Sequence, residues 1–251
     1  MLNYVEYGKE NKYDDDIFFQ KYSQMSRSQQ GLAGAGEWET LRKLLPDFKD
    51  KRVLDLGCGY GWHCIYAMEH GASSVVGVDI SHKMLEVAKE KTHFPQVEYK
   101  CCAIEDVEFP EESFDVILSS LAFHYVADYE ILVKKIYRIL KSGGKLVFTV
   151  EHPVFTAYGT QDWYYNEKGE ILHFPVDNYY YEGKRTAVFL GEKVTKFHRT
   201  LTTYLNTLLS NGFIINHIVE PQPPEYMMDI PGMQDEMRRP MMLIVSANKK
   251  V

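Results

Sequence analysis

An aspartate followed by three alternate glycines is the first group of residues in this sequence that could do chemistry. The segment VLDLGCGYGW, residues 53–62, places Asp55 in an apolar run and then Gly57, Gly59 and Gly61. Glycines after a strand let the backbone approach a ligand closely. A carboxylate at the start of such a turn attracts a cation and repels a phosphate. The segment therefore predicts a site for a zwitterionic or positively charged ligand.

Two common nucleotide-binding motifs do not fit this segment. A phosphate-binding P-loop ends in Gly-Lys-Ser/Thr, which is absent after Gly61. A dinucleotide-binding loop has the pattern Gly-x-Gly-x-x-Gly, and counting from Gly57 its third glycine is replaced by Trp62. A nicotinamide-dependent oxidoreductase is therefore a disfavoured alternative.

Three histidines form a second candidate group. His124 follows the fourth expected strand, His152 ends the fifth, and His198 opens a helix further on. Because the carboxyl ends of parallel strands meet at one edge of a sheet, we expect all three to face one cleft. A histidine there could deprotonate or orient a nucleophile. We predict His152 for this role, His124 as the second choice, and Arg199 as a partner for an acidic group of the substrate.

Alternating strands and helices must position these residues. Apolar, β-rich runs predict strands at 53–56, 74–79, 97–101, 114–119 and 145–150, with two more near 213–220 and 241–247. Helical spacing predicts helices at 63–70, 82–91 and 129–140, the last ending at the glycines 143–144. We therefore predict an α/β fold, a doubly wound, mostly parallel sheet of seven strands with its ligand edge at the carboxyl ends of the strands.

The rest of the chain is expected to complete a single domain over residues 1–251. Residues 1–45 form an N-terminal helical cover, with helices near 18–25 and 37–45 joined by a flexible linker, and residues 46–152 form the ligand-binding core. Residues 153–197 form an insertion with turn signals at 168–169 and 182–183, and residues 198–251 form a C-terminal helix and strand hairpin. The insertion is rich in aromatic residues, which predict a lid over substrate, a satellite core or a subunit interface: Trp163, Tyr164, Tyr165, Phe174, Tyr179, Tyr180 and Tyr181.

Composition excludes several classes of partner. The net charge of -7 argues against a general nucleic-acid binder, which carries a basic face. No apolar run approaches the roughly 20 residues that span a bilayer, so we expect a cytoplasmic protein without a membrane partner. We expect reduced thiols and no metal site because no pair of Cys-x-x-Cys motifs is present among Cys58, Cys64, Cys101 and Cys102.

The glycine segment resembles the first motif of the class I methyltransferases that use S-adenosylmethionine, in particular their bacterial small-molecule type. The resemblance covers residues 50–150 and makes 46–152 a cofactor-binding core with S-adenosylhomocysteine as product. It implies that Asp55 neighbours the amino group of the cofactor and that Gly57, Gly59 and Gly61 approach its methionine part. Asp79 ends the segment VVGVD, twenty positions after Gly59, where an acid in this family accepts both ribose hydroxyls.

Further cofactor contacts are implied by the same resemblance. Where many relatives have an aspartate for the adenine amino group, this sequence has Ala103, so that contact falls to Glu105, backbone or water. The segment FFQKYSQMSRSQQG resembles segments that fold over the cofactor. The residues implied are Ile80 and Met84 against the adenine, Ile104 and Glu105 at its rim, Ser119 to Leu121 near the methionine, and Tyr22, Met25 and Arg27 in the cover.

The methyl acceptor is expected to be a small, partly apolar molecule with an oxygen or nitrogen nucleophile, because aromatic rings suit such a ligand. An Asn/Asp-Pro-Pro-Tyr/Phe motif, which would indicate methylation of a nucleic-acid base, is absent after the fourth strand. A non-catalytic S-adenosylmethionine sensor and a protein methyltransferase stay open as alternatives. We expect a monomer or a homodimer.

Overall fold

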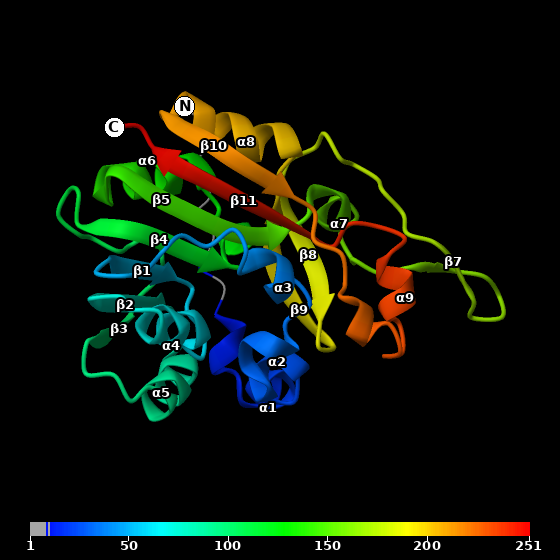
Figure 1. The fold of residues 1–251 in the computed structure, drawn as a ribbon. Coiled ribbons are helices and arrows are strands. Elements are labelled where there is room, and N and C mark those ends of the chain that lie inside the picture. Colours follow the sequence, from blue (N-terminus) through cyan, green and yellow to red (C-terminus); the bar gives the residue numbers. More distant parts are fainter. Residues whose placement is uncertain (1–8, 10) are drawn as a thin grey trace.

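The computed structural model describes residue 9 and residues 11–251. Its centre is a seven-stranded sheet with the order β10-β11-β5-β4-β1-β2-β3 (Figure 1). β11 is antiparallel to both of its neighbours, and the other neighbouring strands are parallel. The predicted fold class is confirmed. The strands are β1 (Arg52–Leu56), β2 (Ser74–Asp79), β3 (Val97–Cys101), β4 (Phe114–Ser120), β5 (Leu140–Glu151), β10 (Phe213–Val219) and β11 (Met242–Lys249).

Helices cover both faces of the sheet. Successive side chains of a strand point to opposite faces, so Val53 and Leu54 of β1 enter two different apolar clusters. The cluster around Leu54 includes residues of α6 (Tyr129–Ile139) and α8 (Leu201–Ser210), whereas the cluster around Val53 includes residues of short α3 (Trp38–Leu41), α4 (Trp62–Glu69) and α5 (His82–Lys91). This two-sided burial explains the nearly continuous apolar runs of the central strands. In the described part of the chain, no helix combines the length and apolarity needed to cross a membrane.

The crossover from α6 into β5 differs from the prediction. Asp128 caps α6 by accepting a hydrogen bond from the Ile131 backbone N–H, at 2.9 Å. The helix ends at Ile139, and β5 starts at the next residue. Gly143, expected to stop the helix, has φ 72° within the first part of the β5 segment. The predicted helix end at residue 140 was therefore one residue late, and the stop does not lie at the glycines.

The N-terminal segment consists of short turns and helices. They are η1 (Lys12–Asp14), α1 (Asp16–Ser23), α2 (Ser26–Gln29) and η2 (Gly31–Gly34), followed by α3. The expected flexible linker is wrong, since α2 and η2 occupy it, and the second expected helix is limited to the four residues of α3. Asp14 attaches this segment to the start of α5 by accepting hydrogen bonds from Ser81 Oγ at 2.6 Å and from the Lys83 backbone N–H at 3.1 Å.

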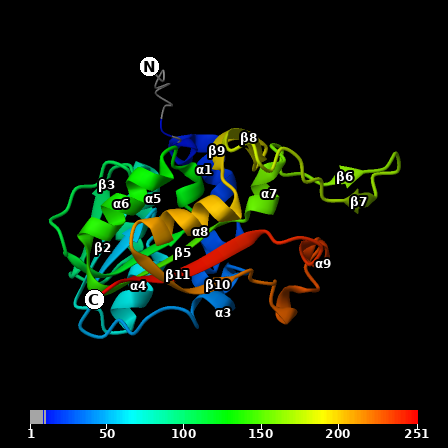
Figure 2. The same cartoon turned by 90° about the horizontal axis from the view of Figure 1, so that it is seen from above.

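The insertion contains α7 (Pro153–Ala157) and two hairpins. β6 (Tyr164–Tyr165) pairs with β7 (Ile171–His173) across the predicted turn, and this hairpin extends away from the sheet (Figure 2). β8 (Gly183–Phe189) pairs with β9 (Glu192–His198).

The second hairpin turn was predicted wrongly. It lies at Leu190-Gly191, where φ is 54° and 80°, and not at 182–183. Positive φ at both residues suits a tight hairpin, but a leucine in this conformation gives no turn signal in the sequence. His198 ends β9 and Thr200 caps α8, so the expected start of that helix at His198 was also wrong.

The two C-terminal strands pair as predicted, although no tight turn joins them. Residues 220–241 connect β10 to β11 and contain η4 (Glu225–Met227) and α9 (Met233–Glu236).

Arg199 holds the loop after β4 in place. Its side chain is buried, and its guanidinium donates hydrogen bonds to the carbonyl oxygens of Val126 and, at 2.9 Å, Ala127. Its Cζ atom also lies 5.4 Å from the ring centre of Tyr129. The guanidinium thereby fixes the chain directly after η3 (Phe123–Tyr125). Arg199 has this structural role in place of the predicted contact with an acidic substrate.

We predict that Arg199→Leu lowers the free energy of unfolding by about 3 kcal/mol, because it leaves buried carbonyl oxygens without their charged donor. Urea unfolding would measure the change. Arg42→Leu is the matched control, since the Arg42 side chain is 49% exposed and its ion pair with Glu39 contributes less than about 1 kcal/mol. Equal losses in both variants would contradict the structural role of Arg199.

Candidate functional site

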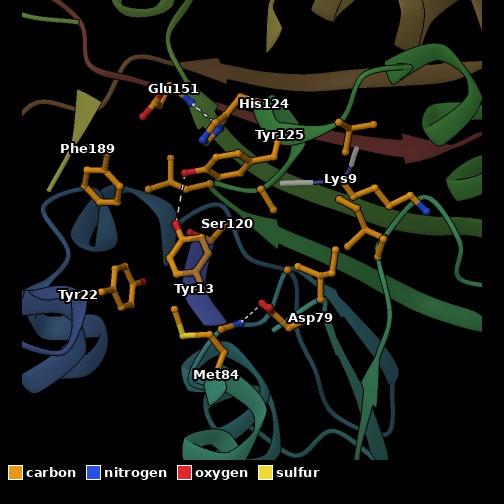
Figure 3. A pocket seen from close by; sticks show the side chains of 18 of the residues that line it. Lys9, Tyr13, Tyr22, Asp79, Met84, Ser120, His124, Tyr125, Glu151 and Phe189 are labelled. Carbon is orange, nitrogen blue, oxygen red and sulfur yellow. Dashed lines mark hydrogen bonds between the residues drawn. The ribbon is translucent and has the colours of Figure 1, made fainter. Parts of the chain in front are cut away.

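A cavity of about 220 Å³ lies at the carboxyl edge of the sheet. Residues at or directly after the ends of β1, β2, β4 and β5 line it, together with the N-terminal segment and the tip of the β8–β9 hairpin. Asp79 and Met84 lie at one end, His124 and Glu151 lie at the other, and Tyr13 stands between them (Figure 3). The position agrees with the rule that open α/β sheets bind ligands outside the carboxyl ends of their strands.

The predicted glycines have different surroundings. Gly57 and Gly59 line the cavity, with φ of 78° and 53°. A Cβ atom on Gly57 would lie 2.4 Å from the Cβ atom of Ala122, whereas one on Gly59 would meet no described atom within 4 Å and would occupy open space. Gly61 lies outside the lining and precedes α4, where a Cβ atom would clash with the hydroxyl of Tyr99. Gly57 and Gly61 thus serve close packing, while Gly59 leaves room for a ligand.

Asp79 is fixed at the end of β2 and faces the cavity. Its Oδ2 atom accepts a hydrogen bond from the Gly59 backbone N–H at 2.8 Å, and its Oδ1 atom accepts one from the Ser81 backbone N–H at 2.9 Å. Burial raises the pKa of Asp79, which these two hydrogen bonds oppose. Each carboxylate oxygen keeps a second lone pair for a ligand hydroxyl.

Asp55 lies beneath the glycine loop, outside the lining of the cavity. It is 1% exposed, and burial raises its pKa to about 7. Its Oδ2 atom accepts a weak hydrogen bond from Cys64 Sγ at 3.5 Å, whereas Oδ1 has no partner among the described residues. A buried, half-satisfied carboxyl of this kind favours a nearby cation.

Most of the other predicted cofactor residues line the cavity. Ser119 does not, because its Oγ atom donates to the Leu56 carbonyl oxygen at 2.7 Å and its neighbour Ser120 lines the cavity instead. The predicted residues brought together here are Ile80, Met84, Ile104 and Glu105 near Asp79, Leu121 after β4, and Tyr22, Met25 and Arg27 from the N-terminal segment.

A second cavity, of about 80 Å³, shares Arg27, Gly57 and Gly59 with the first. Arg27 Nη2 donates to Glu37 Oε1 at 2.5 Å, and Glu37 is buried. Four buried polar atoms of its lining have no hydrogen-bond partner within the described chain: Ser28 Oγ, Glu37 Oε2, Trp62 Nε1 and His63 Nε2. Because such atoms are rare in folded proteins, the second cavity is suited to a polar ligand group.

The three histidines do not share one cleft. His124 lines the cavity, and its Nδ1 atom accepts a hydrogen bond from the Glu151 backbone N–H at 3.4 Å, which leaves the proton on Nε2. Burial lowers the pKa of His124 to about 4, so this ring is neutral at pH 7. His152 caps α7 by accepting from the Val154 backbone N–H at 3.1 Å, and His198 donates from Nε2 to the Tyr179 carbonyl oxygen at 2.8 Å.

The prediction of one common cleft is therefore wrong. β5 ends at Glu151, which lines the cavity, and the chain turns into α7 at His152. The Nε2 atom of His152 lies 2.9 Å from Glu220 Oε1, outside the lining.

Sequence reasoning missed several lining residues. Glu151 lies one position before a predicted site residue, so the end of the fifth strand was a signal that could have found it. Tyr13, Tyr125 and Phe189 come from segments whose packing gives no local signal. The seven aromatic residues of the predicted lid are not in the described lining, and two of them, Trp163 and Phe174, pack around the guanidinium of Arg239 instead. The other lining residues that were not predicted to bind are Lys9, Ala103, Ala122, Val126, Met241 and Met242.

Comparisons with known proteins agree with this geometry. Residues 54–148 match a family model described as a methyltransferase domain. The structure is similar to that of a candidate S-adenosylmethionine-dependent methyltransferase from Listeria monocytogenes, with 57% identity and a TM-score of 0.84, covering 88% of this chain and all of that one. It is also similar to an S-adenosylmethionine-dependent methyltransferase from Mesorhizobium loti, with 40% identity and a TM-score of 0.81, covering 87% of this chain and all of that one.

A third relative matches over the core alone. The ubiquinone biosynthesis O-methyltransferase of Coxiella burnetii is 36% identical over 112 residues, which are 44% of this chain and 47% of that protein. The two structural relatives, by contrast, are matched over their full length at more than 30% identity. The chain belongs to the S-adenosylmethionine-dependent methyltransferases.

Proposed function

We propose that this methyltransferase transfers the methyl group to an oxygen or nitrogen atom of a small, partly apolar molecule held in the 220 Å³ cavity. One observation carries the proposal: a single cavity joins the end around Asp79 to the end around Glu151, so donor and acceptor can lie side by side. The named Coxiella relative, an O-methyltransferase by its description, supports an oxygen nucleophile.

We assign the adenosine part of the cofactor to the end around Asp79. The fixed carboxylate of Asp79 is suited to accept the ribose hydroxyls, and the apolar side chains of Met84 and Ile104 are suited to pack against the adenine. The open space at Gly59 leaves room for the link between the adenosine and methionine parts of the cofactor. With Ala103 in the lining, a polar contact to the adenine falls to Glu105 or backbone.

We assign the methionine part to the second cavity. Its amino and carboxylate groups need a negative and a positive partner, which Glu37 and Arg27 provide. Trp62 Nε1–H, which has no partner among the described residues, is a further donor for the cofactor's carboxylate. The buried carboxyl of Asp55, beneath the glycine loop, favours the cofactor's ammonium group. The residues present therefore fit a zwitterionic group.

The bound cofactor supplies an electrophilic methyl group, and the acceptor end positions the nucleophile. Tyr13 and Tyr125 meet through their hydroxyls, 3.3 Å apart, beside the apolar side chains of Phe189 and Met242. Positioning of this kind contributes roughly 7 to 11 kcal/mol to rate enhancement in well-oriented reactions. The N–H of neutral His124 is a hydrogen-bond donor at this end.

Arg27→Met tests the methionine assignment. We predict that it raises the Kd for S-adenosylhomocysteine about 10- to 100-fold, because a charge-assisted hydrogen bond is lost. The Kd for 5′-methylthioadenosine, which lacks the amino-acid part, should stay unchanged and thereby report an intact adenosine end. Calorimetry on both ligands measures the difference. Equal weakening for the two ligands would contradict the assignment.

Asp55 provides a test by proton release. At pH 7 a carboxyl with a pKa of about 7 is roughly half protonated. A bound ammonium favours the carboxylate and lowers this pKa, so binding of S-adenosylhomocysteine should release up to about half a proton at pH 7. Calorimetry in buffers of different ionisation enthalpy measures the release. Asp55→Asn should abolish it, and unchanged release in that variant would show that the proton comes from another group.

A screen of acceptors tests the proposed reaction. We expect S-adenosylhomocysteine to form with S-adenosylmethionine and small hydroxylated or amino aromatic compounds, and mass spectrometry should detect the methylated product. DNA and RNA oligonucleotides and a lysine-containing peptide serve as controls and should stay unmodified. Methylation confined to an oligonucleotide or to the peptide would contradict a small-molecule acceptor.

A further inference from the structure

The insertion reaches the acceptor end of the cavity through two polar side chains. Lys196 Nζ on β9 donates to Glu151 Oε1 at 2.5 Å and to Gln161 Oε1 at 2.9 Å. Gln161 Nε2 in turn donates to Glu151 Oε2 at 2.6 Å. The three side chains form a closed triangle, and two of them come from the insertion.

This triangle is buried and contains a full ion pair. The Glu151 side chain is 12% exposed and that of Lys196 3%, and Lys196 Nζ lies 5.4 Å from the ring centre of Phe189 and 6.0 Å from that of Tyr125. Withdrawing two charges from water costs about as much as their attraction returns, so a buried ion pair is weak evidence for a purely stabilising role. Its place in the cavity wall points to a role in binding.

The surrounding groups keep Glu151 ionised. Burial alone would raise its pKa. The positive charge that His124 carries in the acid range, the Lys196 ammonium and the hydrogen bonds from Lys196 and Gln161 outweigh burial and lower it. Tyr204 of α8, another titratable group that interacts with Glu151, is neutral because burial raises its pKa. Each oxygen of the carboxylate keeps a lone pair for a substrate donor.

We propose that Lys196 and Gln161 orient the Glu151 carboxylate so that it accepts a hydrogen bond from the nucleophilic hydroxyl of the substrate. The Nε2–H of His124 then donates a hydrogen bond to a neighbouring acceptor atom of the same substrate. The acceptor site then selects uncharged hydroxyl compounds that carry a hydrogen-bond acceptor beside the hydroxyl. Glu151 and His124 contact the substrate in this arrangement, whereas Lys196 and Gln161 are positioning residues. The inference rests on the proposed methylation of a small molecule.

Charge pairing argues against anionic and protonated substrates. Three cations at or behind the described lining have acidic partners: Lys9 with Asp106, Arg27 with Glu37 and Lys196 with Glu151. A fourth, Arg199, is buried behind η3 and donates its hydrogen bonds to backbone carbonyl oxygens. An anionic substrate would therefore meet the Glu151 carboxylate without an unpaired cation to offset it. A protonated amine would suit the carboxylate, but it has no lone pair with which to attack the methyl carbon. A neutral hydroxyl has both the proton and the lone pair.

The proposed step balances without a further reactant. The substrate oxygen forms a bond to the methyl carbon as that carbon's bond to sulfur breaks, and the electron pair of the broken bond stays on sulfur. The hydroxyl proton passes to Glu151. A carboxylate is a weak base towards a free hydroxyl, but this proton becomes strongly acidic as the new oxygen–carbon bond forms. Glu151 returns the proton to solvent after the product leaves.

Three variants test the ionisation of Glu151 through the pH dependence of kcat/KM. In Lys196→Met, burial is no longer offset by the ammonium, so the pKa of Glu151 rises and the acid limb moves up by about one pH unit or more. Lys193→Met, the same change at an exposed position of the same strand, should leave the profile unchanged. Glu151→Gln should remove the acid limb and lower kcat about 100-fold, with an unchanged Kd for S-adenosylhomocysteine.

The charge selectivity has a test that needs no turnover. With S-adenosylhomocysteine bound, calorimetry should show 2-hydroxybenzamide binding at least about tenfold more tightly than benzamide, which lacks the hydroxyl, or 2-hydroxybenzoate, which is anionic. Glu151→Gln should reduce the affinity for 2-hydroxybenzamide to that for benzamide. Equal binding of the three probes, or no binding of 2-hydroxybenzamide, would overturn the inference.

Failure of the inference is distinguishable from failure of the proposed function. A small-molecule acceptor that Glu151→Gln methylates at the wild-type rate and with the wild-type pH profile would overturn the role of Glu151, yet leave the proposed function standing. Absence of transfer to every small molecule, with transfer to the peptide or an oligonucleotide, would overturn the proposed function and the inference with it.

Discussion

The site depends on the attachment of the loop after β1 to the end of β2. The backbone N–H groups of Gly57 and Cys58 both donate to the Val78 carbonyl oxygen, at 2.8 and 2.9 Å, and the N–H of Gly59 donates to Asp79 Oδ2 at 2.8 Å. These three hydrogen bonds hold the loop in a conformation with positive φ, which glycine adopts without steric cost. They also aim the carboxylate of Asp79 into the cavity, so one short network shapes both the loop and the acid beside it.

Segments outside the parallel core complete the site with buried ion pairs. The N-terminal segment contributes Arg27, which pairs with Glu37 at the second cavity, and the insertion contributes Lys196, which pairs with Glu151 at the opposite end. Each pair brings one unit of each charge into a region of low polarity, where the attraction between the partners offsets the cost of withdrawing them from water. The N-terminal segment thus completes the second cavity, which we assign to the methionine part of the cofactor, whereas the insertion borders the end of the first cavity around Glu151.

Patterns within single elements could be predicted from the sequence. Apolar, β-rich runs gave the bounds of β2 and β3, because strands inside the sheet are buried, and helical spacing gave the bounds of α5, because one face of that helix is buried. The edge of the sheet that binds the cofactor could also be predicted, because the glycine loop and Asp79 lie at strand ends whose position in the sheet follows from the right-handed crossovers. Turn positions were less predictable where the backbone conformation is unusual for the residue, as at Leu190.

The sequence by itself determined the sheet, the glycine loop and the carboxylate at the end of β2, because each of these depends on residues close together in the chain. Only the tertiary structure decided which side chain at a strand end enters the cavity: Glu151 and Ser120 do, whereas His152 and Ser119 turn away. The pairing of Lys196 with Glu151 was likewise invisible, since it joins residues 45 positions apart through an insertion whose path no local pattern encodes. The direction of a side chain at a strand end, and its contact with a residue of the insertion, depend on how distant segments pack together. A local sequence period carries no information about that packing.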